Sequence, residues 1–260
     1  MRSLILAATF AFSSMSVFAN QCDVEFDGKL QFENNVLQVQ LDKYNQLEIT
    51  ENRTLYVNNK LISLNSEQQN WINEYYNGIK QAIPQAANIA TDAVALASSA
   101  INEVFTELLG SDSKIMKDLS QKLSDLDEQI QYNFYAEDGN IRLNSDTFEN
   151  GKFMGEQWED EFEETMEELV SESIGHFIIT LGSQIIFGGD DMDAFEQKME
   201  RFGEQIEHKV EYQAAALEQK AETLCATLEN VDFAENKMQD NIPQLRKLDV
   251  VQVSKSVNLM

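Results

Sequence analysis

The spacing of apolar residues changes once near the start of the chain, and this change constrains the fold more than any other feature. Apolar and polar residues alternate between residues 22 and 64, whereas apolar residues recur at steps of three and four from Ser66 onward. Alternation is typical of a strand with one buried face, and steps of three and four are typical of a helix. The sequence therefore predicts an α+β fold, with an N-terminal antiparallel β-meander packed against long α-helices and a small β-hairpin inserted between helices.

The alternating segment predicts about five or six short strands. Pairs of turn-forming residues separate them: Asp27-Gly28, Asn34-Asn35, Tyr44-Asn45 and Asn58-Asn59. Short alternating runs joined by such pairs favour antiparallel strands that follow one another in a meander. We expect the β-meander to occupy residues 20–65 and to bury one of its faces.

The next segment, residues 66–131, predicts helices. Ser66 and Glu67 offer an N-cap and an acidic first turn, and one apolar face then continues as far as Gly110. Pro84 lies inside this pattern and has no main-chain N–H, so we expect a kink or a break near residues 81–83. A shorter helix is predicted over residues 113–130.

Period two returns in residues 132–148, around the strongest hairpin signal in the chain, Asp138-Gly139. An isolated hairpin is marginally stable in water, so we expect this one to pack against the meander or the helices. Residues 154–230 predict two long helices separated by Gly188-Gly189-Asp190, and such a short link favours an antiparallel helical hairpin. Residues 231–260 predict a mixed tail in which 250–253 is a candidate strand.

Residues 1–19 have the layout of a secretory signal peptide. Arg2 supplies a positive charge, and the apolar run at residues 4–12 is shorter than the roughly 20 residues that span a bilayer. Val17 and Ala19 are residues that signal peptidase accepts at positions −3 and −1. We therefore predict cleavage after Ala19, export across a membrane and a single mature domain over residues 20–260. A buried N-terminal helix is the alternative.

Cys22 and Cys225 are the two cysteines of the chain. Disulfides persist in oxidising compartments, so in an exported chain we expect these residues to be bonded to each other. Two unpaired or buried thiols are the alternative. The bond would clamp the first strand to the helical hairpin. Together with His176 and His208 the cysteines show no structural-zinc spacing, so we predict neither a metal site nor a cofactor.

The formal net charge is −26, while hydrophobic residues make up 43% of the sequence. Such a chain can bury a core and remain soluble, with a large excess of carboxylates on its surface. Binding to nucleic acid requires a basic surface, so we expect no nucleic-acid partner. Cationic ligands and basic faces of envelope proteins remain compatible partners.

Two acidic groups could attract a divalent cation, namely residues 156–168 and the cluster of Asp190, Asp191 and Asp193. No calcium-binding loop of the EF-hand type accompanies them, and a solvated helix face and helix capping explain them better. The apolar segment 174–187 is too short to span a bilayer, so we predict no transmembrane segment in the mature chain.

The sequence contains no nucleophile elbow, phosphate-binding glycine loop or dinucleotide fingerprint, so it offers no catalytic residue. The favoured function is that of a non-enzymatic binding or envelope-associated protein that uses the helical hairpin or a groove between sheet and helices. The alternatives are a hydrolase that uses paired carboxylates and an acidic protein that binds divalent cations.

Short segments spread over the mature chain carry a resemblance to a known family. They are Cys22-Asp23-Val24, Leu55-Tyr56-Val57-Asn58-Asn59-Lys60, Leu64, Gln68-Gln69, Tyr75, Pro84, Ile89-Ala90, Leu224-Cys225 and Ile242-Pro243-Gln244-Leu245. In these residues the chain resembles the YggN-like family, a domain family of unknown function in Gram-negative bacteria. The resemblance implies a periplasmic location and paired terminal cysteines, and it implies no catalytic residues.

Overall fold

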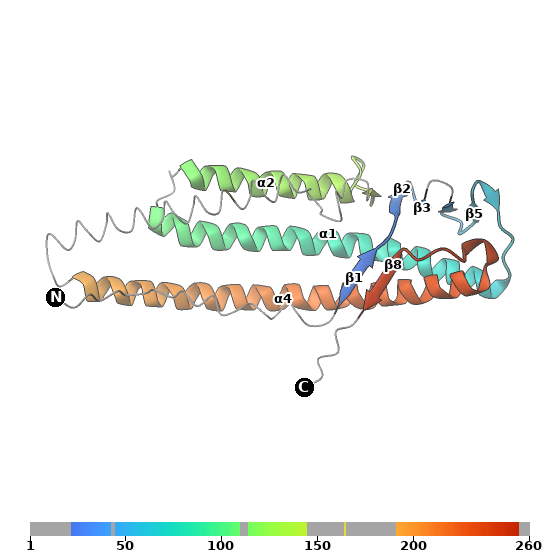
Figure 1. Cartoon of the computed structure of the whole chain (residues 1–260). Coiled ribbons are helices and arrows are strands. Elements are labelled where there is room, and N and C mark those ends of the chain that lie inside the picture. Colours follow the sequence, from blue (N-terminus) through green and yellow to red (C-terminus); the bar gives the residue numbers. More distant parts are fainter. Residues whose placement is uncertain (1–21, 43–44, 110–113, 145–163, 165–190, 255–260) are drawn as a thin grey trace, which may run out of the picture.

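The computed structural model describes residues 22–42, 45–109, 114–144, 164 and 191–254. Helices α1 (Ser66–Leu109), α2 (Lys114–Phe134) and α4 (Asp191–Asn241) lie side by side with α1 in the middle, and most strands gather at one end of them (Figure 1). The predicted α+β fold is confirmed.

Helices α1 and α4 run antiparallel and bury the main helical interface. Near one end, the side-chain amide of Gln68 donates a hydrogen bond to the carbonyl of Asn241 at 2.9 Å. Further along, Lys220 forms an ion pair with Asp92. The 51 residues of α4 extend over about 76 Å. Most of the buried core lies between these two helices and the strands.

Helix α4 continues to Asn241, so the predicted helix end at residue 230 is wrong. Val231, Ala234 and Met238 extend its apolar stripe and are fully buried, which keeps the chain helical through the segment predicted as mixed tail. The helix ends before Pro243, because the proline ring makes the helical conformation unfavourable for the residue that precedes it. Pro243 then begins the short 3-10 helix η3 (Pro243–Leu245).

Strands β2 to β6 form the predicted meander, and β7 adds to it through β2, which gives the order β6-β5-β4-β3-β2-β7. The strands are β2 (Lys29–Glu33), β3 (Val36–Asp42), β4 (Asn45–Ile49), β5 (Leu55–Val57), β6 (Lys60–Leu61) and β7 (Leu143–Asn144). The turn residues Asn34, Asn35, Asn58 and Asn59 all have positive φ. Asparagine tolerates this conformation, which is why the Asn-Asn pairs mark the hairpins.

Strand β1 (Asp23–Phe26) is not part of the meander, contrary to the prediction. It pairs with β8 (Val251–Ser254) in a separate antiparallel two-stranded sheet that lies against α4 (Figure 1). The chain turns at Gly28, whose φ is 100°, and this turn separates β1 from β2. The candidate strand near the C-terminus is confirmed.

The predicted hairpin at residues 132–148 is only partly formed. Helix α2 continues to Phe134 because Ile130 and Phe134, one turn apart, are both buried on its inner face. An isolated antiparallel bridge joins Tyr135 to Ile141 around the predicted turn, and β7 then pairs with β2. The expected packing against the meander is therefore confirmed, but the first predicted strand is helical.

Helix α1 is continuous through Pro84, so of the expected kink or break the break is absent, and the kink stays a prediction. Ile83 and Ala87, on either side of the proline, are both buried in the core. Their packing offsets the cost of proline inside a helix, which is about 3 kcal/mol.

The N-cap of α1 is Asn65, not Ser66. Its side-chain oxygen accepts a hydrogen bond from the main-chain N–H of Gln68 at 2.9 Å, and the Gln68 side chain accepts one from the N–H of Asn65. This is a capping box in which asparagine and glutamine take the two roles.

The first of the two predicted long helices and the Gly188-Gly189-Asp190 link lie outside the described residues, so the helical hairpin stays a prediction. Among the residues that are described, no helix is long and apolar enough to cross a membrane.

Candidate functional site

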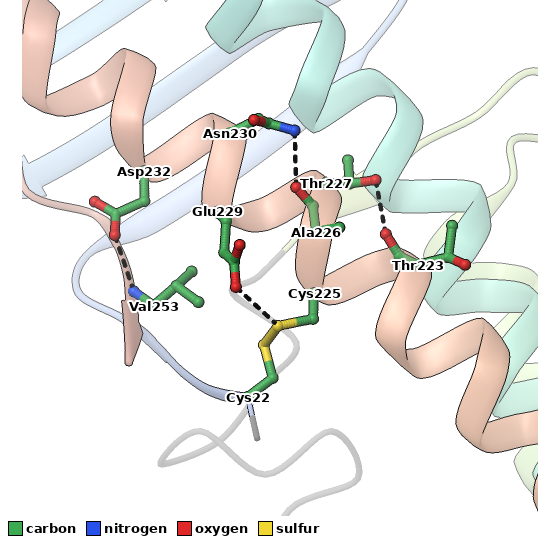
Figure 2. The surroundings of a disulfide bond; sticks show 9 residues. All are labelled: Cys22, Thr223, Cys225, Ala226, Thr227, Glu229, Asn230, Asp232 and Val253. Atoms are coloured by element: carbon green, nitrogen blue, oxygen red, sulfur yellow. Dashed lines mark hydrogen bonds between the residues drawn. A yellow bond between two sulfur atoms is a disulfide. The ribbon is translucent and has the colours of Figure 1, made fainter. Parts of the chain in front are cut away.

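The cysteine pair is the one site that the sequence predicted by residue, and Cys22 and Cys225 are bonded as expected. The S–S distance is 2.02 Å and the two Cα atoms are 6.0 Å apart, across 203 positions of sequence. Cys22 lies directly before β1 and is exposed, whereas Cys225 is buried on α4. The disulfide therefore fixes the start of β1 to the long helix (Figure 2).

Acidic side chains of α4 surround this junction. Glu229 lies one helical turn beyond Cys225, and its Oε1 atom is 3.7 Å from the Cys225 sulfur (Figure 2). The next acidic residue, Asp232, accepts a hydrogen bond from the N–H of Val253 at 3.2 Å (Figure 2). A negative charge beside the sulfur disfavours the thiolate that leaves when the disulfide is attacked. Glu229 is therefore placed to slow those reduction reactions in which Cys225 leaves as the thiolate.

Glu235 holds the other end of β8. Its Oε1 atom accepts hydrogen bonds from the main-chain N–H groups of Val250 and Val251, the second at 3.2 Å. Asp232 and Glu235 are one helical turn apart, so they lie on the same side of α4. Together they satisfy three N–H groups at and beside the edge of β8 that faces away from β1.

Glu235 is only 2% exposed. Burial raises its pKa from 4.5 to about 7, against the opposing effect of the Val250 and Val251 N–H groups and the Tyr75 hydroxyl. Tyr75, on α1, is fully buried, and its pKa is raised by burial and then by the charge of Glu235. The Tyr75 hydroxyl oxygen and Glu235 Oε2 both lack a hydrogen-bond partner among the described residues. The Tyr75 hydroxyl therefore influences the Glu235 pKa without forming a hydrogen bond of ordinary geometry.

A second polar cluster fastens the meander turns to α1. The Arg53 guanidinium lies 3.9 Å from the ring centroid of Tyr76, and the Tyr76 hydroxyl donates a hydrogen bond to the carbonyl of Asn35 at 2.7 Å. Lys80 donates to the side-chain oxygen of Asn35 at 2.9 Å. These cationic groups are engaged in holding two turns on the helix, so their role is structural.

The described residues form two open pockets of about 230 Å³ each. One lies between β4, β5 and η3, where Arg246 and Lys247 supply positive charge, and the other lies between α1 and α4 beside Tyr212. Pockets that bind small molecules usually have about 300 to 1,000 Å³. Glu235 lines neither of these two pockets.

The structure leaves untested most of the other residues that were weighed as cation ligands. Residues 156–168, apart from the exposed Glu164, and His176 and Asp190 lie outside the described residues, and the side chains of Asp191, Asp193 and His208 are likewise not described. Within the described part of the chain, no group of three or more His, Cys, Asp or Glu side chains could hold a metal ion.

Comparison with known proteins places this architecture in a family. A family model described as a protein of unknown function (DUF2884) matches residues 22–251, from the first cysteine to the first residue of β8. The chain belongs to the DUF2884 family. No curated protein and no solved structure shows a significant match. Membership in DUF2884 assigns no ligand and no catalytic residue, and the YggN name stays a prediction.

In this DUF2884 chain, the contacts of Asp232 and Glu235 with β8 were missed by sequence reasoning. The available signal was their position: Glu235 stands between the apolar residues Ala234 and Met238 on the buried stripe of α4, where a carboxylate needs a buried partner. The partner groups are main-chain N–H groups, which a side-chain pattern does not reveal.

Proposed function

We propose that this DUF2884 protein is exported to the periplasm and acts there as a non-enzymatic binding protein. The observation that carries the proposal is the Cys22–Cys225 disulfide, which joins the start of the domain to its longest helix. Such bonds are maintained in oxidising compartments. The signal-peptide pattern of residues 1–19 supports the same location.

The use of the polar side chains supports binding over catalysis. Glu235, Asp232 and Arg53 each hold one structural element on another, and none of them lines a described pocket. The described pockets are small and open, whereas a substrate for hydrolysis needs a cleft in which two carboxyls converge. A net charge of −26 favours basic protein surfaces as partners through electrostatic steering.

Export and binding are tested separately. For export, the tagged chain is expressed in a Gram-negative host, and mass spectrometry of the periplasmic fraction is expected to find a mature N-terminus at Asn20. A chain that stays in the cytoplasm with its leader attached would contradict export.

For binding, a photo-crosslinking amino acid is placed at the exposed positions Tyr212, on α4, and Leu61, on β6, in separate variants. Irradiation of intact cells is expected to yield a discrete crosslinked product, identified by mass spectrometry, from at least one position. The matched control is each variant handled in the same way without irradiation. If the exposed positions give no product above this control, the protein does not work by binding a protein partner through these surfaces.

A further inference from the structure

Strand β1 has one edge that no described residue covers. The N–H of Asp27 donates to the carbonyl of Val250 at 2.9 Å, so the main-chain N–H of Asp27 points toward the β8 side of the sheet. Successive residues of a strand alternate in the direction of their main-chain groups. The N–H and C=O groups of Val24 and Phe26 therefore point away from β8, and the N–H groups of their partners Val253 and Val251 bond to α4 as this alternation requires.

This edge is held in place before any ligand arrives. The disulfide at Cys22 anchors the residue next to β1, and the ladder to β8 holds the inner edge of the strand. Strand β8 is itself fastened to α4 by Asp232 and Glu235. Ordering a flexible segment costs conformational entropy, so a strand that is already fixed binds an added strand at a smaller entropic cost.

The charges along the edge are negative. Glu25 and Asp27 are both exposed, two positions apart and hence on the same face. Proteins often carry lysine or proline on exposed edge strands, where these residues discourage pairing with another chain. Residues 22–27 contain neither, whereas the two-residue edge strand β6 begins with Lys60. A second copy of this chain would bring like charges together, with −26 on each molecule, so the edge disfavours pairing with itself.

We propose that the outer edge of β1 accepts an extended, cationic segment of a partner protein as an added strand. Val24 and Phe26 supply its main-chain hydrogen bonds, and Glu25 and Asp27 pair with lysine or arginine on one face. The Phe26 side chain, 56% exposed, packs against apolar residues of the partner at the intervening positions. This rests on the binding function proposed above and names the partner's chemistry.

The first test uses a short synthetic peptide that alternates lysine and valine, labelled with a fluorophore, and the purified oxidised protein at low salt. Fluorescence anisotropy is expected to show saturable binding. A peptide with glutamate in place of lysine is expected to bind at least about tenfold more weakly, because like charges on paired strands destabilise them.

A third peptide decides whether the main chain takes part. It keeps the lysines but carries N-methyl groups on all its main-chain amides, which removes the N–H groups of both edges and leaves the charge unchanged. If the peptide adds as a strand, N-methylation weakens binding at least about tenfold. Equal binding of the methylated and unmethylated peptides would mean plain charge attraction and would overturn the proposal.

Three protein variants locate the site. Phe26→Pro deletes an outward N–H and spares the ladder to β8, since proline is tolerated where its nitrogen faces away from the partner strand. It is expected to weaken peptide binding several-fold more than Phe26→Ala, which loses only the ring. Glu25→Lys, at an exposed position, is expected to weaken binding of the lysine peptide and to strengthen binding of the glutamate peptide.

All three variants must retain the disulfide and the helical circular dichroism of the parent protein. If Phe26→Pro fails this control, Glu25→Lys and the methylated peptide still decide the question. Peptide binding that is insensitive to all of them would place the peptide elsewhere and overturn the proposal. Crosslinks in cells at Tyr212 without any peptide binding would refute the β1 site and leave the proposed binding function standing.

Discussion

The Oε1 atom of Glu235, on α4, lies 3.2 Å from the main-chain nitrogen of Val251, on β8. A carboxyl that is almost fully buried thus takes the place that a neighbouring strand would occupy. Strand β8 is therefore held by β1 on one edge and by a helix on the other. Since β1 carries the first cysteine, the two-stranded sheet and the disulfide form one clamp on α4.

Removing the Glu235 carboxyl should cost more stability than removing that of Asp232. Glu235→Ala leaves the buried N–H groups of Val250 and Val251 without an acceptor, and each such loss costs about 1 to 3 kcal/mol. Asp232→Ala leaves only the part-buried N–H of Val253. Urea unfolding should give a loss of about 2 to 5 kcal/mol for the first variant and about 1 kcal/mol for the second. Equal losses would show that Glu235 does not support β8.

The same carboxyl should make stability depend on pH. Burial raises the pKa of Glu235 from 4.5 to about 7, so between these values the folded state holds a proton that the unfolded state has released. Its contribution to stability is therefore fully present below about pH 4.5 and is lost as the pH rises to about 7. Each pKa unit corresponds to about 1.4 kcal/mol, so the loss amounts to about 3 kcal/mol.

The control for this pH dependence is Glu235→Gln, which has nearly the same shape and does not titrate. The free energy of unfolding of both proteins is measured by urea titration between pH 4 and pH 8. The difference between wild type and variant should fall in the acidic range and level off above about pH 7. A constant difference over the whole range would mean that Glu235 does not titrate in this window.

Gly78 of α1 permits a close approach to α4, because a methyl group at this position would overlap the Cγ2 atom of Val231. In an exposed helix Gly→Ala stabilises by about 1 kcal/mol, but overpacking a core costs about 1 to 3 kcal/mol. We expect Gly78→Ala to destabilise the protein, as measured by thermal unfolding.

A second variant tests the cause of this effect. It combines Gly78→Ala with Val231→Ala, and the second substitution removes the overlapping methyl group. In a double-mutant cycle the alanine at 78 should be less harmful, or stabilising, when residue 231 is also alanine. Independent effects of the two substitutions would show that α1 and α4 are not in contact at this point.

The elements that the sequence predicted correctly are those set by local chemistry. The Asn34-Asn35 and Asn58-Asn59 pairs adopt the positive φ that tight hairpins need, so the meander could be read directly. Residues 132–136 were ambiguous, because Tyr132, Phe134 and Ala136 alternate while Ile130 and Phe134 also share one helical face. Burial of that face decided for the helix.

The pairing of β1 with β8 could not be predicted in the same way. Val24 and its partner Val253 are separated by more than 200 positions, and nothing in the period of either segment names its partner. The clamp residues were hidden for a similar reason. Glu235 is one of 45 acidic residues in the chain, and only the position of β8 shows that its partners are main-chain N–H groups.

The two cysteines should contribute differently once the disulfide is reduced. In the oxidised protein, both Cys22→Ser and Cys225→Ser should lower the melting temperature, because each opens a loop across 203 positions, and Cys225→Ser should lower it somewhat more because its hydroxyl is buried. The loop-closure entropy sets an upper limit of about 5 kcal/mol, equivalent to about 10 to 20 °C for a domain of this size.

In the reduced protein, Cys22→Ser should have no effect, because Cys22 is exposed, whereas Cys225→Ser should cost up to about 1 kcal/mol at its buried position. Calorimetry with and without reductant checks both values, and a large loss from Cys22→Ser under reducing conditions would show that residue 22 acts through packing and not through its bond to α4.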